Sequence, residues 1–192
     1  TDVIDVDSIG FNFDQIDSVK EKLAEKRGIF VVSGPKGSGV SSMLYSMIRN
    51  HDGFTENIFS YEKELLCEID NITQNLVESE DVSDDVYHKG LRSIFLADPD
   101  AVMVGFCENE QMAKGATDYV HDEKQKKLYI ANEAPTVFHA LQNWIKMVGD
   151  AKKTADTLSV VTCQRLVRKL CTHCREAYIP DPALLKKLNL QK

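Results

Sequence analysis

A short apolar stretch followed by a glycine-rich turn constrains the fold of this chain more than any other feature. Residues 29–33 read Ile-Phe-Val-Val-Ser, and residues 34–39 read Gly-Pro-Lys-Gly-Ser-Gly. A continuously apolar strand is typical of a parallel sheet that is covered on both faces. Because glycine allows a tight reversal, we expect the turn to lead into a helix over residues 40–49. The order strand, turn, helix predicts an α/β fold.

Alternating strand and helix patterns surround this unit. Residues 14–26 place Ile16, Val19 and Leu23 on one helical face, and Gly28 ends that helix. The other predicted strands are 57–61, 101–105, 127–131 and 158–163, and the other predicted helices are 87–96, 111–120 and 137–147. Such alternation predicts a doubly wound domain, a mostly parallel twisted sheet with helices on both faces.

The amino-acid composition limits the kinds of binding partner and the cellular compartment that can be expected. The chain has 23 basic and 30 acidic residues, a net charge of −7, and no long block of Lys or Arg, so we expect no nucleic-acid partner. The acidic run at 78–85 is expected to be a solvated loop. No apolar stretch approaches the roughly 18 residues of a membrane span, which predicts a cytoplasmic domain. The five scattered cysteines indicate reduced thiols.

The glycine turn has the spacing of a phosphate-binding loop, with one departure. Residues 34–41 read GPKGSGVS against the P-loop pattern GxxxxGK[ST]. Backbone N–H groups can converge on an anion in such a turn, and the Ser41 hydroxyl could bind magnesium. Val40 replaces the lysine, and by itself the turn fits a plain structural loop equally well. The candidate nucleotide-binding residues are Gly34, Pro35, Lys36, Gly37, Ser38, Gly39, Val40, Ser41 and Ser42.

Three further segments of the chain also match sequence motifs. Residues 57–62 read NIFSYE, residues 91–105 read LRSIFLADPDAVMVG, and residues 164–174 read QRLVRKLCTHC. Together with the turn they resemble the C-terminal domain of type II secretion and type IV pilus assembly ATPases, whose segments are an acidic Asp box, LRxxLRxDPDxxxxGE and QRLVRKLCxxC. The resemblance covers about residues 29–180. It implies a RecA-like P-loop NTPase domain of a family that uses ATP and magnesium.

The resemblance divides the chain into three parts. Residues 1–28 are expected to be a lead-in segment from a preceding domain or linker. Residues 29–170 would form the RecA-like domain, and residues 171–192 a C-terminal tail. Because the chain opens on Thr1 rather than methionine, we expect it to be part of a longer protein.

The family's catalytic positions hold other residues in this chain. Val40 stands at the P-loop lysine, and Phe106 stands at the glutamate that organises magnesium and positions water. Lys63 replaces an aspartate after the retained Glu62, and the segment around Glu133 lacks the family's histidine box. Phosphoryl transfer depends on such charges, so the sequence predicts no intact catalytic residue.

Some polar residues of the family are retained. Glu62, Arg92, Asp98 and Asp100 make up a candidate residual polar site, whereas Glu108 stands where the family has an arginine. The group would matter for function only if the fold brings its members together.

The C-terminal motif carries basic residues and two cysteines. Arg165 and Arg168 are expected on a helix beside the sheet, either in scaffold salt bridges or facing a neighbouring subunit's nucleotide. Cys171 and Cys174 supply half of a four-ligand zinc site, with two free thiols as the alternative. In type II secretion members a second CxxC lies further on, so we do not expect zinc in this chain alone.

These departures favour a catalytically degenerate domain, a pseudo-ATPase that acts as a structural or regulatory subunit of type II secretion or type IV pilus-like machinery. This hypothesis requires no cofactor and no enzymatic activity. One alternative is a sensor that holds ADP or ATP without turnover. The other is an active motor with relocated groups such as Lys36 and Glu108. The expected partners are machinery proteins, a catalytic paralogue or further copies of the chain, with membrane contact only through partners.

Overall fold

A parallel sheet of six strands forms the centre of the molecule. The computed structural model describes residues 5–77, 84–123 and 125–189. The strands are β1 (Gly28–Gly34), β2 (Ile58–Glu62), β3 (Thr73–Leu76), β4 (Ala101–Val104), β5 (Lys127–Glu133) and β6 (Leu158–Cys163), in the order β3-β2-β4-β5-β1-β6. All neighbouring strands run parallel, so the predicted doubly wound sheet is confirmed.

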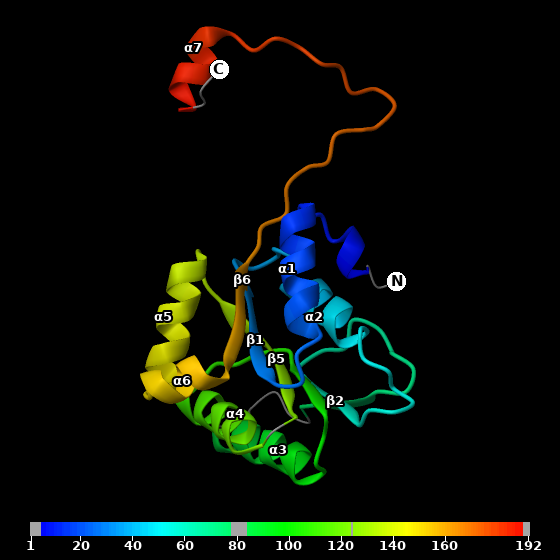
Figure 1. Ribbon diagram of the computed structural model, residues 1–192, viewed down its shortest axis with the longest axis vertical. Helices are drawn as coiled ribbons and strands as arrows, with labels where there is room; N and C mark the ends of the chain where they lie inside the picture. The colour runs from blue at the N-terminus through cyan, green and yellow to red at the C-terminus, as the bar shows by residue number, and fades with distance from the viewer. Residues whose placement is uncertain (1–4, 78–83, 124, 190–192) are drawn as a thin grey trace.

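Helices cover both faces of this sheet (Figure 1). They are the 3-10 helix η1 (Val6–Ser8) and the α-helices α1 (Phe13–Leu23), α2 (Val40–Ile48), α3 (Asp84–Leu96), α4 (Glu110–Asp122), α5 (Val137–Val148), α6 (Ala151–Thr157) and α7 (Pro182–Lys187). The sequence predicted α1 to α5 to within a few residues and did not predict α6 or α7. Most of the predicted acidic loop, residues 78–83, lies outside the described residues. Across the described part of the chain, no helix is long and apolar enough to cross a bilayer.

Alternating side chains of β1 build one apolar core on each side of the sheet. Ile29 and Val31 pack with α3, α4 and α5, whereas Phe30 and Val32 pack with α1 and α2. All of these side chains are fully buried. A strand covered on both faces needs an apolar side chain at every position, which explains the continuous apolar run.

The lead-in segment packs on the same body. Val6 of η1 and Val19 of α1 belong to the core that α2 shares with the sheet. The Lys20 ammonium of α1 also lies 2.6 Å from the Asp7 carboxylate of η1. The boundary after this segment stays a prediction.

Local side-chain caps determine where several helices begin and end. Asn12 and Gln15 exchange side-chain and backbone hydrogen bonds in a capping box at the start of α1. Asn109 caps α4 by accepting a hydrogen bond from the backbone N–H of Met112. Gly149 takes a left-handed conformation and ends α5.

The carboxyl ends of the strands meet at one edge of the sheet. Gly34 at the end of β1 lies in register with Glu133 at the end of β5. The backbone N–H of Gln164, just after β6, donates to the carbonyl of Ser33 at 2.9 Å. Ligands of open α/β sheets bind outside this edge, so the glycine turn lies where a nucleotide would be expected.

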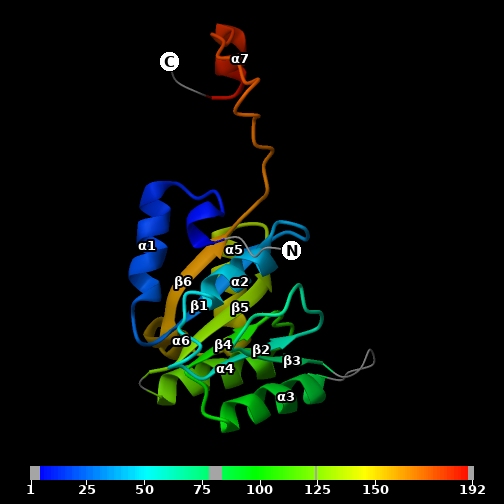
Figure 2. The same ribbon diagram turned by 90° about the vertical axis from the view of Figure 1, so that its right-hand side faces the viewer.

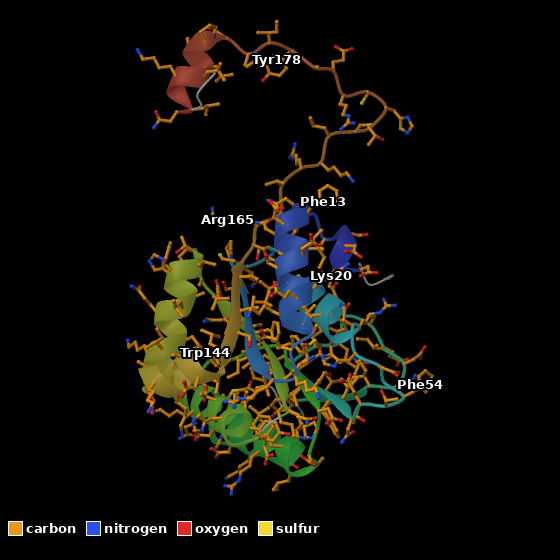
Figure 3. The ribbon with its side chains drawn as sticks, in the orientation of Figure 1. Phe13, Lys20, Phe54, Trp144, Arg165 and Tyr178 are labelled. Carbon is orange, nitrogen blue, oxygen red and sulfur yellow. The ribbon has the colours of Figure 1, made fainter. Side chains whose placement is uncertain are left out.

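After β6 the chain leaves the body as an extended tail that ends in α7, as Figure 2 shows. Residues 164–170 have no regular secondary structure, so the predicted helix carrying Arg165 and Arg168 is wrong. Figure 3 places Arg165 where the tail leaves the body and Tyr178 far along it. A short helix needs an apolar face to bury, and the Leu166 side chain is 72% exposed.

Candidate nucleotide-binding site

The 34–41 turn has the backbone shape of an anion-binding loop. Gly37 (φ +78°) and Gly39 (φ +83°) are left-handed, a conformation that glycine adopts at little cost. Left-handed residues beside right-handed ones can point successive N–H groups toward one anion. The turn is also tight, because a Cβ added to Gly34 would lie 2.2 Å from Oγ of Ser38.

The turn lines a cavity of about 1040 Å³ at the carboxyl edge of the sheet. Its walls include residues 34–42, 105–108 and 131–133. Ligand pockets commonly have volumes of about 300–1,000 Å³, so a nucleotide would fit. The structure therefore brings all the candidate nucleotide-binding residues together, with Phe106 and Glu133 beside them.

The turn itself carries little positive charge. Val40 opens α2 with an apolar side chain where the P-loop pattern has its lysine. Lys36, four residues earlier, lines the cavity but is exposed to solvent. Because water screens an exposed ammonium, Lys36 would attract a phosphate far less than an enclosed lysine would.

Phe106 belongs to the hydrophobic core. It is 7% exposed, and its ring centroid lies 5.6 Å from that of Tyr61 and 4.9 Å from that of Tyr87. The Lys63 ammonium lies 4.8 Å from the same ring centroid, in cation–π geometry. An aromatic cluster thus surrounds the position at which the family resemblance predicts a glutamate, and a phenylalanine side chain offers no ligand to a metal ion and no hydrogen bond to water.

Lys63 and Glu108 form an ion pair beside this cluster. Nζ of Lys63 lies 2.6 Å from Oε1 of Glu108, and the side chains are 43% and 57% exposed. An exposed pair contributes only about 0.2–1 kcal/mol to stability. Its main consequence is positional, because it holds an ammonium where the family resemblance places an aspartate.

Glu62 is retained, but its carboxylate is already engaged. The residue is 3% exposed; Oε2 accepts a hydrogen bond from the Tyr45 hydroxyl and Oε1 one from the Ser60 hydroxyl, both at 2.6 Å. Burial, and then the hydrogen bond with Glu62, raise the pKa of the Tyr45 phenol, which therefore remains a donor. A metal ion would have to displace one of these hydroxyls.

Glu133 places a negative charge beside the turn. It ends β5 in register with Gly34 and is exposed. The next histidine along the chain, His139, lies in the first turn of α5, where its Nδ1 is 2.8 Å from the Thr136 hydroxyl oxygen. The described residues that line the cavity include no histidine.

The other members of the candidate residual polar site lie elsewhere. Asp98 and Asp100 precede β4 and so lie at the amino edge of the sheet, opposite the turn. Nζ of Lys126 lies 2.6 Å from Oδ1 of Asp98, and the Asp100 carboxylate accepts a backbone hydrogen bond from the loop before β2. Arg92 is exposed on α3. These residues therefore do not assemble with Glu62.

The paired cysteines lie on the tail. Cys171 and Cys174 are both exposed. Hydrogen bonds from the backbone N–H groups of His173 and Cys174 lower the pKa of the Cys171 thiol. Within the described ranges, no three His, Cys, Asp or Glu side chains come together as a metal site. The half zinc site stays a prediction.

Some residues that shape the site were given no role from the sequence. Nε2 of Gln164 donates to the Ser38 carbonyl at 3.0 Å, and a Cβ added to Gly39 would lie 3.4 Å from the Leu166 side chain. Lys146 of α5 also lines the cavity. Gln164 is the first residue of the QRLVRKLCTHC segment. It lies against the glycine turn because β6, which it follows, pairs with β1.

The chain is similar to ATPases of pilus and secretion machines. It is 28% identical over 193 residues to the type IV pilus assembly ATPase PilB of Thermus thermophilus, a match that covers 100% of this chain and 21% of that protein. It is 30% identical over 190 residues to the type II secretion system ATPase E of Vibrio cholerae, covering 98% of this chain and 37% of that protein. The chain therefore spans well under half the length of these relatives.

Solved structures share the fold. The ATPase DotB of Legionella pneumophila matches with a TM-score of 0.64 and 17% identity, over 80% of this chain and 42% of that chain. The pilus retraction motor PilT with bound ADP matches with a TM-score of 0.62 and 19% identity, over 81% and 44%. The predicted RecA-like P-loop fold is thereby confirmed. Because the family model described as Type II/IV secretion system protein matches residues 1–191, the chain belongs to that family.

Proposed function

We propose that this chain is a catalytically degenerate member of its family and acts as a structural or regulatory subunit of type II secretion or type IV pilus-like machinery. The observation that supports this most directly is the aromatic cluster around Phe106. A buried ring that contacts Tyr61 and Tyr87 occupies the position where the family resemblance requires a metal-organising carboxylate. The proposal requires no enzymatic activity.

The free energy of the missing charge-assisted contacts supports the proposed loss of hydrolysis. A charge-assisted contact contributes about 1.5–3 kcal/mol, so losing one from a transition state would slow a reaction roughly 10- to 150-fold. Val40, Phe106 and Lys63 each remove or reverse such a contact, and Glu62 is engaged by hydroxyl groups. Several losses of this size together would reduce hydrolysis to background.

The scaffold, by contrast, is intact. Buried apolar side chains form a core on each side of the sheet, and Lys126 forms an ion pair with Asp98 in the loop before β4. A retained shape without catalytic charges supports a role in docking or regulation. We therefore propose that the partners are proteins of the machinery, a catalytic paralogue or further copies of this chain.

The compartment follows from the same proposal. The similar PilB and ATPase E are named for pilus assembly and secretion. We propose a cytoplasmic location, with membrane contact only through partners. The net charge of −7 disfavours a nucleic-acid partner.

A second candidate function is a sensor that holds ADP or ATP without turnover. Two features favour it, the left-handed Gly37 and Gly39 of the turn and the cavity of about 1040 Å³. The absent lysine and the carboxylate of Glu133 beside the turn would weaken binding.

Phosphate release in ATP and magnesium tests the proposed function. The full-length natural protein is expected to release phosphate at the background rate, with Vibrio cholerae ATPase E as the positive control. Turnover comparable to that control would refute the proposal. If such turnover were lost in Lys36→Ala or Glu108→Ala, the alternative with relocated catalytic groups would replace it.

A further inference from the structure

The tail that follows β6 is basic and exposes apolar side chains. Residues 164–192 hold seven basic and two acidic residues, whereas residues 1–163 hold 16 basic and 28 acidic residues. Val167 is 87% exposed and Leu170 is 72% exposed. Exposed apolar side chains indicate a surface that binds a partner, and an excess of basic residues favours an acidic one.

The tail has the pattern of an amphipathic helix that lacks a surface to cover. In a helix over residues 165–175, Val167, Leu170, Cys171 and Cys174 would share one face and the basic side chains would lie on the other. The backbone N–H of Arg175 already donates to the carbonyl of Cys171 at 3.1 Å, which is one turn of α-helical type. A helix of this length is marginal by itself, so it would form when a partner buries its apolar face.

An apolar groove lies beside the opposite edge of the sheet. The edge strands of the described sheet are β6, from which the tail starts, and β3. The groove has a volume of about 490 Å³ and lies over β2, β3 and α3, with Phe59, Leu76, Val77, Val86 and Ile94 in its lining. Leu76 and Val86 are each 48% exposed. Such a groove can bind the apolar face of a short helix.

The charge near this groove complements the tail. Val77 and Val86 both line the groove, and the sequence between them, residues 78–85, contains five acidic residues. Of the described residues that line the groove, Lys89 alone is charged, so the groove itself offers mainly apolar contacts. Attraction between opposite charges extends over about 10 Å at 0.1 M salt. A basic amphipathic segment therefore fits this side of the acidic body.

Two hydrogen bonds fix the direction in which the tail leaves its own body. Nε2 of Gln164 donates to the Ser38 carbonyl at 3.0 Å, and Nη2 of Arg165 donates to the Pro135 carbonyl at 3.2 Å. Figure 2 shows the tail leaving from the β6 side, away from β3 and α3. The groove of the same copy lies five strand spacings from β6, roughly 24 Å, on the other side of the sheet. This direction favours the groove of a neighbouring copy.

We propose that residues 165–175 of one copy form a helix in the β3–α3 groove of a second copy. Val167 and Leu170 face the apolar lining, and the basic face points toward the acidic body. The two copies contribute different surfaces, so the contact can repeat from copy to copy. The inference rests on the proposed function only in taking a further copy of this chain as the partner.

Photo-cross-linking of the full-length protein tests this contact. A photoreactive benzoylphenylalanine in place of Ser93, an exposed residue of α3 that lines the groove, is placed in an isotope-labelled copy and mixed with unlabelled protein. Mass spectrometry should find mixed-isotope cross-links to residues 165–175. The same group in place of Gln142, an exposed residue of α5, is the matched control. It should give about tenfold less of this product, because docking raises the local concentration of the tail at the groove.

Substitutions in the tail separate docking from chance collision. Leu170→Ser should lower the yield about tenfold or more, because a leucine is no longer buried in the groove. Leu188→Ser, which changes an exposed leucine of the tail outside residues 165–175, should leave the yield nearly unchanged. Lys169→Pro should abolish the cross-link, because proline in a helix interior breaks the helix.

Several results would overturn the inference. They are cross-links within single copies only, equal yields from the groups at Ser93 and Gln142, and equal yields from Leu170→Ser and Leu188→Ser. An unchanged yield in Lys169→Pro would contradict the helix. Binding of the tail to vesicles of anionic phosphatidylglycerol without any cross-link between copies would place it on a membrane instead. The proposed function is judged separately, because phosphate release does not depend on these cross-links.

Discussion

The Tyr45 hydroxyl donates a hydrogen bond to Oε2 of Glu62 at 2.6 Å, and this contact joins α2 to the end of β2. The same hydroxyl oxygen accepts a hydrogen bond from the backbone N–H of Leu66 at 3.1 Å. Tyr45 is 1% exposed and Glu62 is 3% exposed. The retained acidic residue therefore stabilises the position of the helix that follows the glycine turn.

Removing this hydroxyl should destabilise the protein. Tyr45→Phe leaves Oε2 of the buried Glu62 without its donor, which should lower the free energy of unfolding by about 1–3 kcal/mol. Urea denaturation followed by circular dichroism measures the change. Tyr178→Phe, on the exposed tail, is the matched control and should have no effect. If Tyr45→Phe is as stable as wild type, the contact does not stabilise the fold.

The fold could largely be predicted because strands β1 and β4 are buried along their whole length and the other strands are short and mostly apolar or flanked by clear turn signals. Residues 158–163 were predicted as a strand and form β6 with the same limits. The error at Arg165 and Arg168 has a clear physical cause. Leu166, Val167 and Leu170 have helix-like spacing, but no neighbouring element covers them, so they remain exposed. Local periodicity cannot show whether an apolar face has a partner.

The site was harder to predict, because residues that are close in the sequence can lie far apart in the structure. Asp98 and Phe106 belong to one motif, yet β4 lies between them. At about 3.3 Å per residue, this strand of four residues separates them by roughly 13 Å. The resemblance predicts a glutamate at the position of Phe106, and the loss of that carboxylate stays a prediction. The pairing of Lys63 with Glu108 required the adjacency of β2 and β4.

Asp98 should matter for stability and not for ligand binding. It has a left-handed backbone (φ +53°), which asparagine tolerates, so Asp98→Asn removes the charge next to Lys126 without new strain. The Asp98 side chain is exposed, and the expected loss is only about 1 kcal/mol. Thermal unfolding measures this loss, and ADP titration should show unchanged affinity. A clear loss of ADP affinity would instead indicate that Asp98 belongs to the binding site.

A buried histidine should make stability depend on pH. Nδ1 of His51 lies 2.6 Å from Oε2 of Glu56, and Nε2 lies 2.7 Å from the Tyr129 hydroxyl oxygen. Burial lowers the pKa of His51; the charges of Glu56 and Asp100 oppose this shift and that of Lys127 adds to it. The folded state therefore binds its proton at a lower pH than the unfolded chain does.

The direction of the pH effect follows from that shift. The stabilisation is complete above the ordinary histidine pKa of about 6.5 and is lost as the pH falls toward the lower folded value. Urea denaturation between pH 7 and pH 5 should therefore show a steeper loss of stability for wild type than for His51→Gln. A single proton limits this extra slope to about 1.4 kcal/mol per pH unit. His121→Gln, on the surface of α4, should follow wild type, and parallel curves for wild type and His51→Gln would contradict the expectation.

Restoring the missing lysine should strengthen ADP binding without restoring hydrolysis. Val40 is the first residue of α2, directly after the left-handed Gly39, so Val40→Lys places an ammonium at the P-loop position. The added charge-assisted contact should tighten ADP binding about tenfold or more, whereas Val40→Met, which adds length without charge, should not. Phosphate release should stay at background, because Phe106 still fills the carboxylate position and Glu62 still accepts two hydroxyl hydrogen bonds. If Val40→Lys alone released phosphate as fast as Vibrio cholerae ATPase E, one substitution would account for the inactivity, and the changes at Phe106 and Lys63 would be compatible with catalysis.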